Sequence, residues 1–137
     1  MRTEKDVEAY LLRLNRAYRS LEAQPGTFLV ETNGGMPPIA VRVDPPLVVV
    51  RVHIGDLEKD SAPGALLRKL LELNARQLVH ASYGIEDDRV VLSSALELEN
   101  LDFNELQATL DEIDVVLAQQ LPELARLAKD GLKTNAC

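Results

Sequence analysis

The chain has 137 residues, the size of a single domain, and its composition of 46% apolar and 27% charged residues excludes a disordered segment. The net charge of −7, concentrated after residue 96, excludes a basic surface for a nucleic-acid backbone. The single cysteine, Cys137, cannot form an internal disulfide, and no apolar run is long enough to cross a membrane. We therefore expect one domain over residues 1–137, with an ordered core at about 4–130 and a short C-terminal tail. We place it in the cytoplasm, with no nucleic-acid partner and no membrane insertion.

The first predicted element is an amphipathic helix over residues 4–23. Its apolar side chains recur at the i, i+3, i+4 spacing of one helix face. Thr3 is suited to cap its N-terminus, and Pro25-Gly26 is expected to stop it.

Three strands are predicted next, over residues 27–32, 39–43 and 47–54. Apolar residues alternate with other residues in each segment, which is the period of a strand with one buried face. Asn33-Gly34-Gly35 and Asp44-Pro45-Pro46 separate them as turns. Short connections of this kind favour an antiparallel meander.

A second helix is predicted over residues 64–78, with Ser61 as a candidate N-cap. Residues 79–85 and 89–98 then read as two strands joined at the polar turn Glu86-Asp87-Asp88. This pair forms a second hairpin.

A last, long helix is predicted over residues 102–130, with Asn100 or Asp102 as its cap. Pro122 is expected to kink or break the helix, and Gly131 to end it. The fold class is therefore α+β in the order α-βββ-α-ββ-α, with a five-stranded antiparallel sheet packed with helices.

The sequence contains no recognisable catalytic motif. His53 and His80 are predicted in different strands, on the face opposite the apolar one, and neither has a cysteine or second histidine at metal-ligand spacing. No glycine-rich loop joins a strand to a helix. We predict no catalytic residue, no metal site and no cofactor, so the protein is not expected to be an enzyme.

The second face of the predicted sheet is a candidate for partner binding. It mixes apolar and basic side chains and differs from a fully solvated sheet surface. Helices could cover this face as an inner layer, or it could stay open for a protein partner, and the sequence leaves both possible. The candidate contact residues are Leu47, Val49, Arg51 and Val91.

The helix predicted over residues 64–78 has leucines around more of its circumference than a one-sided surface helix needs. These leucines could be buried within one chain or could contact a second copy. We favour the second interpretation, which predicts a homodimer. The candidate interface residues are Leu66, Leu67, Leu70 and Leu73.

A helix with a terminal Leu-Leu-Glu-Leu-Asn is followed by a short strand with Tyr-Gly-Ile, an acidic turn and a further strand. This order of elements resembles the type III secretion chaperone-like superfamily. This superfamily includes the Tir-chaperone (CesT-like) and YbjN-like families. The segments that carry the resemblance are Leu70 to Asn74, Ala81 to Leu92, Leu96, Leu98, Leu101-Asp102 and Leu121 to Leu124.

The resemblance implies the same order of elements and a small acidic protein that usually dimerises and has no enzymatic activity. Secretion chaperones of this kind bind an unfolded effector segment in extended form. One alternative is a YbjN-like regulatory or scaffold domain that binds a folded protein. Another is an enzyme or small-molecule binder of an unrecognised kind.

Overall fold

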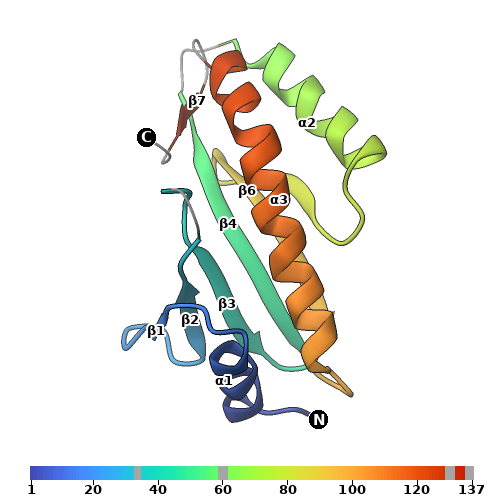
Figure 1. Ribbon diagram of the computed structural model, residues 1–137. Coiled ribbons are helices and arrows are strands. Elements are labelled where there is room, and N and C mark those ends of the chain that lie inside the picture. Colours follow the sequence, from blue (N-terminus) through green and yellow to red (C-terminus); the bar gives the residue numbers. More distant parts are fainter. Residues whose placement is uncertain (33–34, 59–61, 129–131, 135–137) are drawn as a thin grey trace.

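A computed structural model describes residues 1–32, 35–58, 62–128 and the backbone of 132–134. Helices and strands follow one another along the chain in the predicted order, with one extra strand after the first helix and one at the C-terminal end (Figure 1). The elements are α1 Glu4–Arg13, β1 Tyr18–Ser20, β2 Thr27–Val30, β3 Ile39–Asp44, β4 Leu47–Leu57, α2 Gly64–Arg76, β5 Ser82–Glu86, β6 Arg89–Glu97, α3 Phe103–Leu127 and β7 Leu132–Thr134.

All strand pairs in the sheet are antiparallel, in the order β1-β2-β3-β4-β6-β5, and β7 pairs with the end of β4. The predicted α+β class and antiparallel sheet are confirmed. The described residues form seven strands instead of the expected five, because β1 after the first helix and β7 near the C-terminus also pair with the sheet. Strand β4 is the longest and lies at the centre, so it sets the two faces of the sheet.

The first helix is shorter than predicted. It ends at Arg13, and Asn15 adopts a left-handed conformation with φ of 58° that asparagine tolerates and that a helix does not. The chain then pairs Tyr18 with Val30 at the edge of the sheet, and the Tyr18 ring packs edge-on to Phe28 at 6.0 Å. The helical spacing of residues 14–21 is therefore overridden by strand pairing.

One face of the sheet carries the core, and helices cover it. Figure 1 shows α3 running along this face in front of β4 and β6, with α1 at one end. The Tyr10 hydroxyl donates to the Leu101 carbonyl at 3.0 Å, and the Arg13 guanidinium lies 4.0 Å from the Phe103 ring centroid, so α1 is fastened to the start of α3. Helix α2 contacts β5 and α3 at the other end.

The boundaries of α3 depend on its caps. Asp102, one of the two residues predicted as the cap, caps the N-terminus of α3 in a capping box with Glu105. The helix passes through Pro122 without ending, so of the predicted kink or break, the break is wrong. Pro122 is exposed, and the Ala118 carbonyl that loses its donor is also on an exposed residue, where water can replace the bond. Gly131, the predicted stop, lies outside the described residues.

The hairpin turn between β5 and β6 is confirmed. Asp87 and Asp88 have φ of 51° and 62°, the two positive values of a type I′ turn. The Asn33-Gly34 turn and the Ser61 cap lie outside the described residues, and the described part of α2 begins at Gly64, next to Pro63.

Candidate functional site

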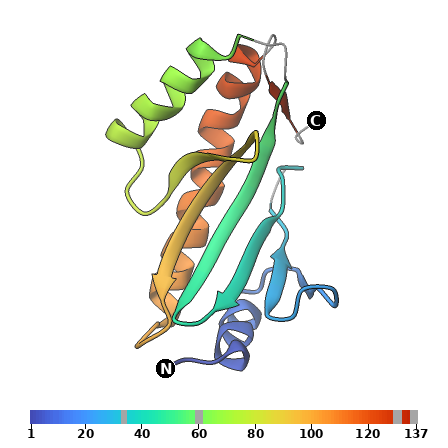
Figure 2. The ribbon, with the colours of Figure 1, turned by 180° about the vertical axis from the view of Figure 1, so that it is seen from behind.

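The face of the sheet opposite α1 and α3 is not covered by any helix of the described residues (Figure 2). We call it the open face. Along β4 the side chains alternate between the two faces: the core side is fully buried and the open side is half-buried. The core side of β4 carries Val48, Val50, Val52 and Ile54, and the open side carries Leu47, Val49, Arg51 and His53.

The sheet brings the four candidate contact residues onto the open face. Leu47 is 37% exposed, Val49 and Arg51 are half-buried, and Val91 is buried, with 8% of its surface exposed. In the β4–β6 register, Val91 pairs with His53 on the same face. This geometry gives a mixed apolar and basic surface without a helix over it. Contact with a partner through these residues remains a prediction.

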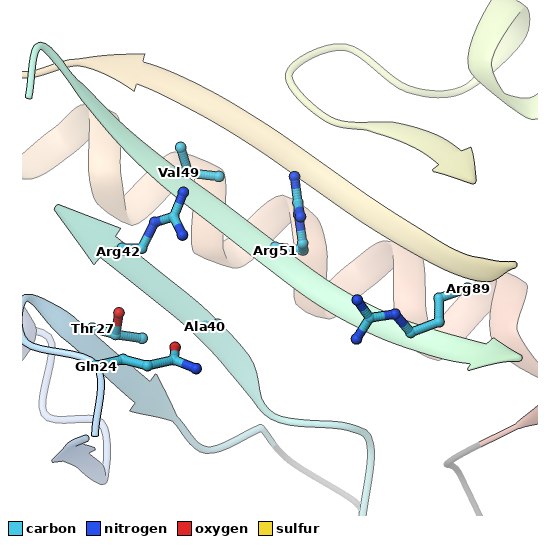
Figure 3. Close-up of a pocket in the computed structure, with 7 residues that line it drawn as sticks. All are labelled: Gln24, Thr27, Ala40, Arg42, Val49, Arg51 and Arg89. Carbon is cyan, nitrogen blue, oxygen red and sulfur yellow. The ribbon is translucent and has the colours of Figure 1, made fainter. Parts of the chain in front are cut away.

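A depression of about 350 Å³ lies in the open face between the loop before β2 and the β3, β4 and β6 strands (Figure 3). We call it the arginine depression, because three arginines from three strands line it. Its lining residues are Gln24, Thr27, Ala40, Arg42, Val49, Arg51 and Arg89.

The arginines differ in their ion pairs. Arg51 reaches Glu86 at 2.8 Å, and Arg42 reaches Asp44 at 3.2 Å, both between side chains with more than a third of their surface exposed. Arg89 has no ion pair within the described part of the chain. Figure 3 shows Arg89 extending from β6 over β4, toward the same side as Arg42.

Two polar atoms at the depression have no hydrogen-bond partner among the described residues. They are the Thr27 Oγ1 atom and the Arg51 Nε atom. Thr27 is 2% exposed and pairs with Arg42 in the β2–β3 register. A buried hydroxyl without a partner costs about 1–3 kcal/mol, so this atom is unusual in a folded domain.

The depression contains residues that the sequence analysis did not select. Arg42 follows from the same alternation that identified Val49 and Arg51. Thr27 and Gln24 come to the depression through the packing of the loop before β2, which leaves no sequence signal. Arg89 lies two residues before Val91 on β6 and follows the same alternation onto the open face, although the sequence analysis did not select it.

The two histidines do not form a site together. His53 lies on β4, and its Nε2 atom is 2.8 Å from the Asp56 carboxylate. His80 lies in a bend before β5, not in a strand as predicted, because the Glu112 carboxylate accepts its backbone N–H and that of Val79. Within the described residues, no group of three histidine, cysteine or acidic side chains could hold a metal ion.

The outer edge of β5 is blocked by Asn74 of α2. Its amide nitrogen donates to the Tyr83 carbonyl at 3.1 Å, and its amide oxygen accepts the Tyr83 N–H at 2.7 Å. Both backbone groups therefore point away from β6, toward the edge where a further strand would pair. The asparagine that ends the Leu70 to Asn74 motif thus occupies this edge.

Helix α2 uses most of its leucines within one chain. Leu66, Leu70 and Leu73 are buried in the core, and Leu67 is half-buried against it. The leucine that α2 leaves to solvent is Leu71, which is 70% exposed. Any contact of α2 with a second copy would therefore rest on the outward stripe of Leu67, Leu71 and Ala75.

No described helix combines the length and the apolar character that a membrane span requires.

Solved structures with low sequence identity share this fold. The Escherichia coli protein YbjN is 13% identical with a TM-score of 0.69, over 97% of this chain and 96% of its own. A chain of the ExoU-SpcU complex from the Pseudomonas aeruginosa type III secretion system is 16% identical with a TM-score of 0.65, over 85% and 95%. A chain from the complex of the Yersinia pestis secretion chaperone SycH with a fragment of YscM2 is 16% identical with a TM-score of 0.52, over 91% and 99%.

None of the curated proteins is similar enough in sequence to match. The family comparison is more direct, since the CesT_Tir_1 model matches residues 1–130. Together with the shared fold, it confirms the resemblance to the type III secretion chaperone-like superfamily. The chain belongs to the CesT_Tir_1 family.

Proposed function

We propose that this protein is a non-enzymatic binding protein of the chaperone type, which holds an extended segment of a partner polypeptide on its open face. The observation that carries the proposal is the helix-free face, where Leu47, Val49 and Arg51 follow one another on the central strand. A chaperone role is supported by the family and by two structural neighbours, the ExoU-SpcU complex and SycH bound to a fragment of YscM2. With one cysteine, the protein suits the reducing cytoplasm.

The face is a better docking surface than the edges of the sheet. Asn74 occupies the Tyr83 backbone groups on the outer edge of β5. At the other end, β1 has three residues and offers a short edge for main-chain pairing. A partner segment on the open face would instead gain apolar contact from Val49 and Leu47 and polar contact from the arginines.

We also propose that the protein works as a homodimer through α2. In the outward stripe, Leu71 and Ala75 are exposed, and Leu67 beside them is only partly packed against the core. Two open faces joined in this way would hold a longer partner segment, which raises its affinity through effective concentration. Of the four leucines expected at this interface from the sequence, the proposal keeps Leu67. The other three are core residues, and Leu71 and Ala75 take their place in the proposal.

The alternative is a regulatory or scaffold domain that binds a folded protein. The similarity to YbjN favours it, since that match covers 97% of this chain. The two functions make opposite demands on the partner: an extended segment binds as an isolated peptide, whereas a folded surface is lost when its domain is unfolded.

The experiment that tests the proposal is purification of the protein from its native host with whatever partner it retains. The complex is trimmed with protease, and the protected partner fragment is synthesised as a peptide. We expect the peptide to bind with nearly the affinity of the whole partner. Binding that requires the folded partner would support the alternative and contradict the proposal.

A further inference from the structure

We propose that the arginine depression is a carboxylate subsite, which takes an aspartate or glutamate side chain of the extended polypeptide. This inference rests on the proposed function and adds a chemical preference to it.

The first argument is the composition of the depression. Guanidinium groups from β3, β4 and β6 line it, and none of its lining residues is acidic. Arginine matches a carboxylate with two parallel N–H donors, and such charge-assisted bonds are stronger than neutral ones. The volume of about 350 Å³ is enough for one acidic side chain and leaves no room for a large folded element.

The second argument is the unused hydrogen-bonding capacity at the same place. Thr27, which is 2% exposed, lines the depression together with Gln24, and its hydroxyl has no hydrogen-bond partner among the described residues. The Arg51 Nε atom is also unpartnered, and Arg89 has no ion pair in the part of the chain that the structure describes. A carboxylate accepts up to four hydrogen bonds, so it can use several of these donors at once.

The third argument concerns the acids at the rim. Asp44 and Glu86 hold Arg42 and Arg51 through exposed ion pairs. Exposed pairs of this kind contribute about 0–1 kcal/mol, so an incoming carboxylate can exchange with them at little cost. The rim acids also repel a second carboxylate beside the first, which limits the subsite to one acidic residue.

The surroundings select a polypeptide over other anions. Ala40 and Val49 line the depression beside the arginines, and Leu47 lies on the same face of β4 next to Val49, which suits neighbouring apolar side chains of a chain in extended form. A phosphate backbone would need a long basic stripe, and the chain has a net charge of −7.

The test is selection from a library of randomised dodecapeptides, first with the wild-type protein and then with Arg89→Gln and Thr27→Val. We expect the wild-type protein to enrich peptides with Asp or Glu at one fixed distance from aliphatic residues. The best peptide should bind roughly tenfold more tightly than its glutamine counterpart, as expected for one charge-assisted contact. Both variants should reduce the ratio of the affinity for the acidic peptide to that for the glutamine peptide toward one. The affinity for the glutamine peptide itself should stay nearly unchanged.

Arg126→Gln is the matched control, since it makes the same charge change on α3, where the side chain is 71% exposed. It should retain the full preference for the acidic peptide. If peptides bind without an acidic preference, or if Arg89→Gln and Thr27→Val both keep it, the subsite is wrong and the proposed function stands. If the wild-type protein enriches no peptide, the proposed function falls and the subsite with it.

Discussion

Val49 and Val50 are adjacent on β4 and point to opposite faces, so one substitution at each separates binding from stability. Val50 has no exposed surface and lies in the core, whereas Val49 is half-buried on the open face. We predict that Val50→Asp unfolds most of the protein and that Val49→Glu removes partner binding from a folded protein.

The magnitudes follow from burial. Val50→Asp loses about 2 kcal/mol of apolar burial and adds several kcal/mol for a carboxyl group without a partner, against a total stability of about 5–15 kcal/mol. Val49→Glu loses at most about 1 kcal/mol of burial. The new carboxylate would lie beside Arg42 and Arg51, and a new exposed ion pair recovers about 0–1 kcal/mol of that loss.

Thermal unfolding and peptide binding give the readouts. For a domain of this size, about 1 kcal/mol corresponds to roughly 4 °C in Tm, so Val49→Glu should stay within about 4 °C of wild type. Val50→Asp should lower Tm by roughly 15 °C or more. A Val49→Glu protein that loses stability like Val50→Asp would show that this face is packed in the native assembly. A Val50→Asp protein with a wild-type Tm would refute the assignment of the faces.

Three further predictions concern α2 and β5. Light scattering should give about twice 15.1 kDa for the wild-type protein, and a monomer at micromolar concentration would contradict the dimer. Leu71→Glu should give a monomer with unchanged secondary structure. Leu70→Ala should instead lower the free energy of unfolding by about 2–5 kcal/mol, because Leu70 is buried. Asn74→Ala should lower the free energy of unfolding, measured in urea, by about 1–3 kcal/mol and should promote aggregation through the freed edge of β5. Unchanged stability would show that the two hydrogen bonds to Tyr83 contribute nothing. Burial raises the pKa of Tyr83, so the folded state favours the protonated phenol. The stability that this protonated phenol contributes is fully present below the ordinary tyrosine pKa of about 10 and is lost as pH rises above it. Tyr83→Phe should therefore lower stability at neutral pH, because the buried bond to Gln120 is lost, and should lose less stability than wild type above pH 10.

The alternation of side chains predicted the central strands and their faces correctly, because the period of two belongs to the sequence itself. Val49 and Arg51 lie on the open face, and Val50 and Val52 in the core, as expected. The short strand β1 could not be predicted in this way. Its three residues continue the helical spacing of the preceding segment, and only pairing with β2 decides against a helix.

One feature beside the arginine depression could not be predicted from the sequence. The register of β4 against β6 shifts between His53 and Gly55, which inserts one extra residue into β4. Residues three apart in a regular strand lie on opposite faces, yet His53 and Asp56 contact each other at 2.8 Å. The same shift brings Asp56 to the open face opposite Arg89, which lies there by its alternation with Val91 on β6.

The net charge of the chain does not decide the charge of its partner, because much of the acidity lies on α3, across the sheet from the arginine depression. Helix α3 carries five acidic side chains and one basic side chain, and it lies on the core face (Figure 1). Packed layers are about 10 Å apart, which is close to the Debye length of about 8 Å at physiological ionic strength. The α3 carboxylates are therefore largely screened at the open face, whereas Arg42, Arg51 and Arg89 contact whatever enters the depression. Lowering the salt lengthens the screening distance, which restores repulsion from α3 and strengthens attraction to the arginines at the same time. An acidic partner should consequently bind with a weaker dependence on salt than three arginines alone would give.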